Sequence, residues 1–447
     1  MIKRLFLLLT PVVVLLAACS DDDTFSTDSS HTLTFASDTI RMDTLFTTIP
    51  SSTYNFWAFN RSGDGIRIRS VRLERGSQSG FRVNVDGTFL NPVATDLEVR
   101  KGDSLRVFVE MTAHENLQPE PKEIDDNLLF TLESGVEQRV NLRAVTWNAQ
   151  KLTNLVVNND TVIESSTPIV IYGSGIQVGK DATLTIKSSR LYFHDGAGIT
   201  VAGRLVADNT LFRGDRLDHM FDYLPYDRVS GQWRGITIAA NAAGCELTNS
   251  EIRSSNTGLY CDSTVVSLTN TVIHNCKGFG LYAHDSEVVL DSCQLTNTLN
   301  DCLALMGCEA FVRKTTLAQF YPLSASRGAA LRFGHTEQPV VLVCSQVLAT
   351  GYADDVVMGE AGDADNTAYL FQDCLLRTPV VADEEAFKDV IWEKSTDAIQ
   401  GLLHFMRVDA TNFIYDFTIK PDSPAFARGI GRCATPEPTP EPEPTEP

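Results

Sequence analysis

A repeat of just over twenty residues is the feature that most constrains the fold of this 447-residue chain. The sequence Leu-Thr-Asn-Ser-Glu-Ile at residues 247–252 returns at 268–273 as Leu-Thr-Asn-Thr-Val-Ile and at 290–295 as Leu-Asp-Ser-Cys-Gln-Leu. A second element, Gly-Leu-Tyr, keeps the same interval at residues 258–260 and 280–282. A fixed period of this length is typical of a solenoid, in which each repeat buries its apolar face by stacking on its neighbours.

The content of the repeat predicts strands. Apolar and polar positions alternate at Val266, Leu268 and Ile273, and again at Leu281 and Ala283, with Asn, Ser, Gly and Asp between the two runs. No apolar stripe of 3.6-residue period is long enough for a helix, so each unit reads as a strand, a turn and a second strand. Stacked units would place each strand parallel to its copy, about 4.8 Å away. Leucine-rich repeats share the period but need a denser leucine line, so a parallel β-helix is favoured over them.

The register can be followed outward from these repeats. The six-residue unit also fits residues 186–191, 206–211, 312–317, 342–347 and 371–376. Insertions interrupt it at residues 213–233, 320–327 and 359–366. The longest, residues 213–233, separates the first element from the second inside one coil. Insertions in a solenoid leave as loops, often on the binding face.

With this pattern, residues 156–376 resemble the right-handed parallel β-helix proteins of the pectate-lyase-like superfamily. The period and the Gly-Ile and Gly-Leu turns carry the resemblance. It implies an all-β fold with a right-handed solenoid, which we expect over residues 148–379. The superfamily includes lyases, hydrolases, adhesins and proteins without known chemistry, so the resemblance implies a fold without choosing an activity.

The first nineteen residues form a lipoprotein signal peptide in this interpretation. Lys3 and Arg4 precede an apolar run at residues 5–16, which ends in Leu-Ala-Ala and Cys19. The run is short and closes with small residues, which is typical of a cleaved signal rather than a spanning helix. The sequence resembles a bacterial lipobox, which implies cleavage before Cys19 and anchoring in a lipid bilayer through its acylated thiol. The alternative is an ordinary secretory signal followed by an unrelated cysteine.

Residues 20–30 form an acidic, Ser-containing linker. Ser20, Asp21, Asp22 and Asp23 resemble the export signal that carries Bacteroidota-type lipoproteins to the cell surface. The resemblance implies an outer-membrane lipoprotein exposed on the surface. The alternatives are retention on the periplasmic face and a linker that is merely solvated.

Residues 31–147 change the pattern to period-two strands separated by turn residues. Such runs include residues 66–73, 81–85, 105–111 and 128–132. Seven or eight short strands at this spacing predict a β-sandwich, and the segment resembles immunoglobulin-like modules of the abnormal-spindle/hydin kind. We expect a stalk or platform; a peptide-binding sandwich is the alternative.

The C-terminal part loses the period. Residues 380–432 carry scattered aromatic residues and are predicted to cap the solenoid, whose open strand edges would otherwise invite aggregation. Residues 433–447 alternate Pro with Glu and Thr, which predicts an extended, disordered tail.

Composition excludes one class of partner. A formal net charge of −20 argues against nucleic acid, which requires a basic face. Ten cysteines include Cys19, and most of the other nine fall on inward ladder positions, where they resemble small buried residues. C-x-x-C is absent and the eight histidines show no ligand-like pairing, so no metal cluster is expected.

The longest insertion is the candidate ligand-binding loop. It combines carboxylates, guanidiniums and aromatic rings, which suit Ca²⁺, uronates and sugar faces respectively. Its candidate residues are Asp215, Arg216, Asp218, His219, Asp222, Tyr223, Tyr226, Asp227, Arg228 and Trp233. The alternative is a solvated loop held down by Tyr226 and Trp233. The carboxylates of this loop would suit Ca²⁺, and no other cofactor is expected.

No residue can be assigned as catalytic from the sequence. Asp354 and Asp355 resemble the double aspartate of β-helix glycoside hydrolases, but the accompanying Asn-Thr-Asp, His-Gly and Arg-Ile-Lys motifs are missing. Two functions therefore remain open. The favoured one is a surface-anchored lipoprotein whose β-helix is a rigid binding or structural module for glycan or protein; the alternative is a polysaccharide lyase or glycoside hydrolase.

Overall fold

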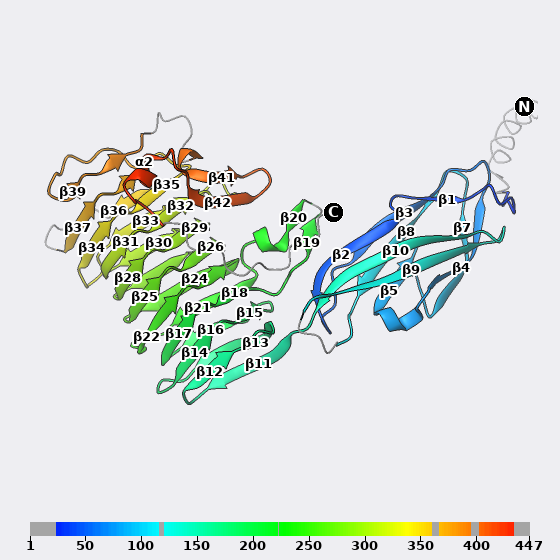
Figure 1. The fold of residues 1–447 in the computed structure, drawn as a ribbon, viewed down its shortest axis with the longest axis horizontal. Helices are drawn as coiled ribbons and strands as arrows, with labels where there is room; N and C mark the ends of the chain where they lie inside the picture. The colour runs from blue at the N-terminus through cyan, green and yellow to red at the C-terminus, as the bar shows by residue number, and fades with distance from the viewer. Residues whose placement is uncertain (1–23, 116–119, 222, 360–365, 395–401, 433–447) are drawn as a thin grey trace, which may run out of the picture. The chain divides into compact units, whose positions relative to one another are not determined.

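The computed structural model describes residues 24–115, 120–221, 223–359, 366–394 and 402–432 (Figure 1). The signal peptide with Cys19, the Ser20–Asp23 segment, Asp222 and the tail lie outside the described residues. The chain divides into two compact units between Trp147 and Asn148. Both are built from strands, as the all-β prediction requires. No helix in the described ranges is long and apolar enough to span a membrane.

The N-terminal unit is a β-sandwich of two five-stranded sheets. One has the order β1 (Leu33–Phe35), β3 (Tyr54–Asn60), β8 (Ser104–Met111), β5 (Phe81–Val85) and β6 (Thr88–Phe89). The other has the order β2 (Thr39–Phe46), β10 (Glu137–Trp147), β9 (Lys122–Leu132), β4 (Ile66–Leu73) and β7 (Val93–Val99). Alternate side chains of both sheets, such as Phe56, Val107 and Leu142, fill one core. The immunoglobulin-like assignment stays a prediction.

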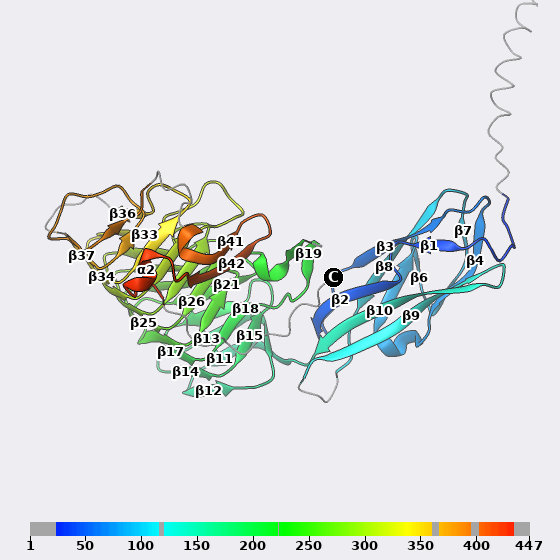
Figure 2. The ribbon, with the colours of Figure 1, turned by 45° about the horizontal axis from the view of Figure 1, so that its top comes forward.

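The second unit is a parallel β-helix whose strands fall into three ladders (Figures 1 and 2). The first ladder consists of β12 (Thr161–Glu164), β14 (Thr183–Lys187), β17 (Arg204–Asp208), β22 (Gly244–Thr248), β25 (Val265–Thr269), β28 (Glu287–Asp291), β31 (Glu309–Arg313), β34 (Val340–Ser345), β37 (Thr367–Gln372) and β39 (Phe387–Lys388). The other two begin together in β11 (Gln150–Val157) and β13 (Ile169–Val178).

The middle ladder continues through β15 (Arg190–Phe193), β18 (Leu211–Gly214), β23 (Glu251–Arg253), β26 (Val272–Cys276), β29 (Gln294–Thr298), β32 (Thr316–Gln319), β35 (Leu348–Gly351), β38 (Leu375–Leu376) and β40 (Ile391–Trp392). The third continues through β16 (Gly198–Val201), β21 (Trp233–Ile238), β24 (Ser255–Asp262), β27 (Leu281–His284), β30 (Leu303–Met306), β33 (Leu331–Gly334) and β36 (Val357–Gly359).

Each regular coil therefore has three strands, not the two elements expected from the sequence. The predicted first element is bent between β25 and β26 at Asn270, whose φ is 49°. Eight other residues at the corresponding turn also have left-handed φ values: Ser188, Asn209, Asn249, Ser292, Lys314, Gln346, Asp373 and Asp389. Most are Asn, Asp or Ser, because short polar side chains tolerate this conformation better than other non-glycine residues. One such residue turns the chain without interrupting the apolar period.

The central register prediction is confirmed. Leu247 pairs with Leu268, and Leu268 pairs with Leu290 in parallel ladders, and all three side chains are fully buried. Two outlying segments need correction. Ala207, not Val206, pairs with Leu247, so the unit is 207–212; a one-residue slip exchanges the inner and outer faces of a strand. Cys344, not Leu342, pairs with Val312, so the unit predicted at 342–347 begins two residues later.

The segment predicted as a cap divides into two parts. β39 and β40 add a last pair of strands to the first and middle ladders. The chain then returns along the outside of the middle ladder as the hairpin β41 (Phe405–Asp409) and β42 (Ile414–Ile419), followed by α2 (Pro424–Ala427). Figures 1 and 2 both show this hairpin beside the middle coils. Its Phe405 and Phe417 form a second core with Ala318, Leu348 and Leu375, so it covers a flank as well as the end.

Candidate ligand-binding cavity

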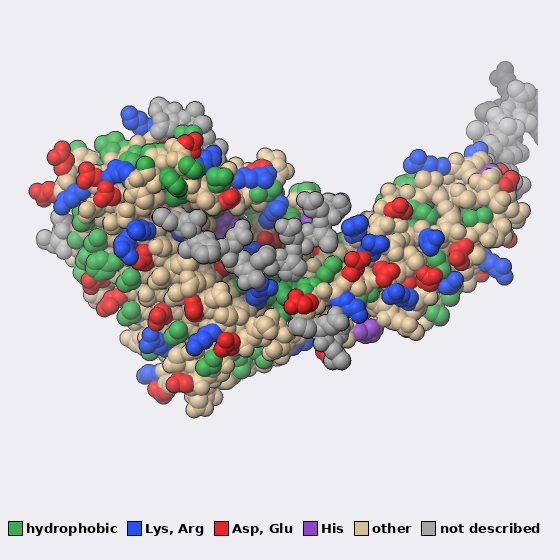
Figure 3. Space-filling view, viewed as in Figure 1, with side chains coloured by type: hydrophobic (Ala, Val, Ile, Leu, Met, Phe, Trp, Pro, Cys, Tyr) green, Lys and Arg blue, Asp and Glu red, His purple; other side chains and the backbone are tan. Residues whose placement is uncertain are grey.

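A cavity of about 400 Å³ lies on the outer face of the middle ladder. Its floor is formed by β23, β26 and β29. Residues 227–228 of the long insertion form one wall, and residues 413–418 of the C-terminal hairpin form another. The insertion contains β19 (His219–Phe221), β20 (Leu224–Pro225) and the 3₁₀ turn η3 (Tyr226–Arg228). Figure 3 shows side chains of both charges interspersed over the visible surface of the β-helix unit.

The cavity lies where neither covering segment seals the ladder. Outward side chains on earlier coils, such as Tyr192 and Arg213, are buried. Those on later coils, Ala318 and Leu348, are buried in the core made with the hairpin. Between them most outward positions are polar, and Val272 is an apolar one. Glu251, Arg253, His274 and Gln294 line the cavity from adjacent strands. The open floor thus ends where the outward residues of the middle ladder change from mostly polar to apolar and the hairpin packs on them.

One carboxylate fastens the insertion to the floor. Asp227 accepts contacts from Arg213 Nη1 at 3.0 Å and Arg253 Nη1 at 3.0 Å, while Arg253 Nε lies 2.9 Å from Glu251 Oε1. Burial alone would raise the pKa of Asp227, but Arg253 and Arg213 outweigh it and hold the pKa below its usual range. Asp227 is therefore ionised, and the floor cations already have carboxylate partners.

His274 is held neutral at the centre of the floor. Burial and the neighbouring Arg253 lower the pKa of His274 to about 4, against the opposing effect of Asp227. Its Nδ1 lies 2.8 Å from Thr296 Oγ1. The ring also packs against Tyr415 and Phe417 of the hairpin, with centroids 6.2 and 6.0 Å away. A neutral imidazole can exchange hydrogen bonds with a ligand without adding charge.

Two asparagines border the cavity at the end of β26 and in β29. Asn275 Nδ2 donates to Ser254 Oγ at 3.2 Å. Asn297 Oδ1 accepts from the backbone N–H of Phe320 at 3.2 Å, but Asn297 Nδ2 has no hydrogen-bond partner among the described residues. Asn297 is only 1% exposed and lines the cavity. A buried donor without a partner is costly, so this amide marks a place for a ligand acceptor.

A hydrogen bond joins the two walls. Arg228 Nη1 donates to the carbonyl oxygen of Asn412 at 2.8 Å, between β41 and β42. Asn412 is itself fixed by its backbone N–H and Nδ2, which donate to the Asp409 carboxylate at 3.0 Å each. This hydrogen bond joins the long insertion to the C-terminal hairpin, across 184 residues of sequence. The cavity therefore needs both segments.

Of the predicted loop residues that the structure describes, only Asp227 and Arg228 line this cavity. Trp233 is fully buried, stacks on Phe193 at 4.3 Å and donates from Nε1 to the carbonyl of Arg253. Its assignment to the ligand-contacting set is therefore corrected, because a fully buried ring packs the coil and offers no surface. Tyr226 lies beneath the guanidinium of Arg216, which binds Asp218 at 2.7 Å, so these three hold the loop together.

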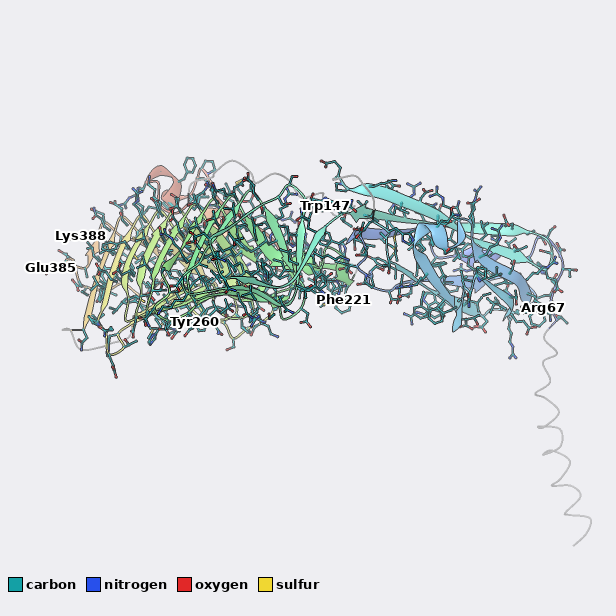
Figure 4. The ribbon with its side chains drawn as sticks, turned by 90° about the horizontal axis from the view of Figure 1, so that it is seen from below. Arg67, Trp147, Phe221, Tyr260, Glu385 and Lys388 are labelled. Atoms are coloured by element: carbon teal, nitrogen blue, oxygen red, sulfur yellow. The ribbon has the colours of Figure 1, made fainter. Side chains whose placement is uncertain are left out.

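The other described loop residues lie elsewhere. Asp215 Oδ2 is 2.7 Å from Nδ1 of His194, and burial raises the pKa of Asp215 despite this hydrogen bond. Tyr223 is 68% exposed and stacks on Phe221 at 5.6 Å, whereas His219 is partly buried. Figure 4 shows Phe221 and Tyr260, two of the exposed aromatic residues of the β-helix unit. Tyr260 stacks on Tyr282 on the outside of the third ladder, at 5.5 Å.

Sequence reasoning missed Glu251, Arg253, His274, Asn297 and Tyr415. The first four occupy regular coils, where the repeat pattern drew attention to the apolar positions between them. Their signal was available: polar outward residues recur beside the apolar ladder at β23, β26 and β29. Tyr415 had no local signal, because its place in the cavity wall depends on the return of the distant hairpin.

In the described ranges no group of three or more His, Cys, Asp or Glu side chains is arranged to hold a metal ion. The Asp354–Asp355 pair is engaged instead with Arg377 at 3.0 Å and Thr378 at 2.7 Å. The eight cysteines of the described chain are buried, as the ladder interpretation predicts, and they are free thiols. Burial raises the pKa of Cys245 to about 12 and that of Cys276 to about 11, so both thiols stay protonated and unreactive.

Comparison with known proteins supports the solenoid. Residues 153–317 match the family model described as a right handed beta helix region. The chain thus contains a right-handed parallel β-helix, which follows the β-sandwich. No curated protein sequence matches the chain.

Solved structures add little. The catalytic unit of a GH87 α-1,3-glucanase from Streptomyces thermodiastaticus strain HF3-3 is 8% identical with a TM-score of 0.16, and the match covers 76% of this chain and 89% of that one. The VesB protease of Vibrio cholerae is 14% identical (27% and 33% covered), and the periplasmic chaperone SfaE is 8% identical (26% and 58%), both with a TM-score of 0.18. The matches span less than two thirds of the protease and chaperone. At these scores the likenesses support no inference.

Proposed function

We propose that this protein is a lipid-anchored binding protein of the outer cell surface, and that its β-helix holds a glycan in the cavity described above. The observation that carries the proposal is the convergence of polar side chains from β23, β26 and β29 on one cavity of about 400 Å³. Cavities of this size suit small ligands or single sugar units, whereas a protein partner normally needs a broad complementary surface.

The floor of the cavity is rigid, so the binding site is already formed before a ligand arrives. The cavity strands belong to ladders whose interior leucines are fully buried, so the floor has little freedom to rearrange. Binding to such a floor avoids the entropic cost of ordering loops. The sandwich then acts as a stalk or platform, and the Cys19 anchor ties the molecule to the membrane.

Binding would be tested by calorimetry on the detergent-solubilised full-length protein against a panel of neutral and acidic oligosaccharides. We expect at least one oligosaccharide to bind, and we expect Arg253→Met to abolish that binding by uncoupling Asp227 and Glu251. Arg313→Met, which removes an exposed guanidinium paired with Asp291, is the matched control. Failure of every oligosaccharide to bind would contradict the proposal.

Anchoring is tested separately. We expect the wild-type protein to enter the detergent phase in a Triton X-114 separation, and Cys19→Ala to move it to the aqueous phase because the acyl chains are lost. Externally added protease should digest the protein on intact cells, and replacing Ser20, Asp21, Asp22 and Asp23 by Ala should protect it. An unchanged partition of Cys19→Ala would refute lipid attachment.

An enzyme remains the second candidate, because Asp227, Glu251 and Asp416 all line the cavity. Paired carboxylates can serve as acid and base in glycoside hydrolysis. Two of the three contact Arg253, and the pKa of Asp227 lies below its usual range, so Asp227 stays ionised and is unsuited to donating a proton. New reducing ends or unsaturated products, lost in Glu251→Gln, would establish this alternative.

A further inference from the structure

The cavity combines an unsatisfied donor with neutralised cations, and this combination restricts the ligand. We propose that the site takes an uncharged sugar residue rather than a uronate or sulfated sugar, and that the carboxamide of Asn297 is the specificity-determining group that reads one of its hydroxyls. The inference rests on the proposed glycan-binding function and names the substrate class of the same cavity.

Asn297 is built to donate. Its Oδ1 is committed to the backbone N–H of Phe320, which fixes the orientation of the amide, and its backbone φ is 54°. Its Nδ2 is left without a partner in the described chain, although the residue is 1% exposed. On the preceding coil, the equivalent Nδ2 of Asn275 donates a hydrogen bond to Ser254. The two asparagines therefore offer different groups to a ligand: Asn297 offers its Nδ2 donor and Asn275 its Oδ1 acceptor.

A hydroxyl group fits this pair better than a carboxylate does. An Asn275 whose Nδ2 is used retains Oδ1 as an acceptor, and Asn297 retains Nδ2 as a donor. The two residues lie on adjacent coils, which are about 4.8 Å apart. A sugar hydroxyl both donates and accepts, so it can satisfy both groups; a carboxylate can only accept.

Charge around the floor also disfavours an anion. Arg253 already contacts Asp227 and Glu251, and Arg213 contacts Asp227. Arg228 is directed to the carbonyl of Asn412. Asp416 adds a third carboxylate to the lining, with its Oδ1 accepting from the backbone N–H of Thr418. An incoming uronate would face three carboxylates and would have to displace existing partners to reach a guanidinium.

The hairpin wall supplies the complementary apolar surface. Tyr415 is half-buried, packs beside His274 and lines the cavity next to Phe413. Sugar rings present C–H faces as well as hydroxyls, and aromatic side chains provide a large rigid contact for such faces. Polar groups on the floor and aromatic groups on the wall thus match the two kinds of surface on one uncharged sugar ring.

The test compares matched neutral and acidic oligosaccharides. Calorimetry on the full-length protein in detergent, at pH 7, would use gluco-, galacto-, manno- and xylo-oligosaccharides beside oligogalacturonate and oligoglucuronate. We expect a neutral series to bind at least ten-fold more tightly than its uronate counterpart. Asn297→Asp keeps the acceptor for Phe320 but removes the donor, and should weaken neutral binding at least ten-fold.

Two further variants distinguish loss of the Asn297 amide from a general effect on folding. Asn297→Gly removes the amide at a backbone conformation that glycine adopts freely, and it should weaken binding to a similar extent. Asn209→Asp, at another left-handed turn with φ 49°, should leave binding within two-fold of wild type. Tight binding of a uronate, or neutral binding unchanged in both Asn297 variants, would overturn this inference while leaving the proposed function intact. If no oligosaccharide binds, both fail.

Discussion

The inside and the outside of the middle ladder are made by the same strands, yet they obey different rules. In β26, Ile273 points inward and repeats the apolar character of Ile252 and Leu295 on neighbouring coils. The next residue, His274, points outward and lies between Arg253 and Thr296, which share no chemical type. The inside must stack on itself and therefore repeats. The outside is free to vary, and beside His274 the long insertion and the C-terminal hairpin enclose it.

The largest expected effect is on the inside. Leu268→Asp should place an unpaired charge between Leu247 and Leu290, and we expect it to unfold the β-helix; loss of the leucine alone should cost about 2–5 kcal/mol. Asn270→Asp, two residues away at the turn, should change the free energy of unfolding by under about 0.5 kcal/mol. Chemical denaturation of both variants is the measurement. Equal destabilisation would mean that the ladder assignment is wrong.

A smaller effect is expected where the outside has been buried. Arg377 is fully buried, with Nη1 2.9 Å from Glu393 Oε1, and Glu393 also contacts Thr350 and His404. Arg377→Met should leave a buried carboxylate without its cation and cost about 3–5 kcal/mol. Thermal and denaturant unfolding would measure this loss.

The control for that substitution is Arg313→Met, whose exposed pair with Asp291 should contribute about 0–1 kcal/mol. If the two arginine variants lost the same stability, the hairpin would not be sealing this part of the ladder.

The cavity itself should be less sensitive. Asp227→Asn removes the charge that pairs with Arg213 and Arg253, and we expect a loss of about 1–3 kcal/mol, confined mainly to the insertion. Limited proteolysis should then cut residues 215–232 faster than in the wild type. Asp262→Asn, at a half-buried pair with His284 on the third ladder, is the control and should not change the cleavage rate. Unchanged protection in Asp227→Asn would show that the insertion is held by other contacts.

The smallest effect concerns pH. The pKa of His274 is lowered to about 4 in the folded chain, whereas an unfolded histidine has a pKa of about 6.5. Between these two pH values His274 is protonated in the unfolded chain but not in the folded chain. Stability from this group is therefore complete above pH 6.5 and declines as the pH falls toward 4. Between pH 7 and pH 6 the loss should be on the order of 0.5 kcal/mol. Denaturation curves of His274→Gln, measured across this pH range, should lack this part of the pH dependence. If the free energy of unfolding of the variant varied with pH as in the wild type, His274 would not be the group responsible.

The repeat made most of the β-helix predictable, because a period can be counted and a one-residue error changes the buried face. Its limits were equally physical. Residues 206–211 were placed one residue out of register because Val206 and Ala207 are both apolar, and only stacking on Leu247 distinguishes them. The three-strand coil was missed because a single left-handed residue such as Asn270 leaves no gap in the pattern.

The candidate site was predictable only in part. The insertion after β18 was recognised as a loop, and its Asp227 and Arg228 do reach the cavity. The other wall comes from residues 413–418, and nothing local to those residues indicates that they return to β26. Long-range packing of Phe405 and Phe417 on Ala318 and Leu348 decides that placement.

A crystal structure of the full chain with a neutral oligosaccharide tests the central claim most directly. We expect a sugar ring between β26, β29 and the Phe413–Thr418 wall, with a hydroxyl oxygen about 3 Å from Asn297 Nδ2. A sugar bound instead on the outside of the third ladder, against Tyr260 and Tyr282, with the cavity holding only water, would contradict it.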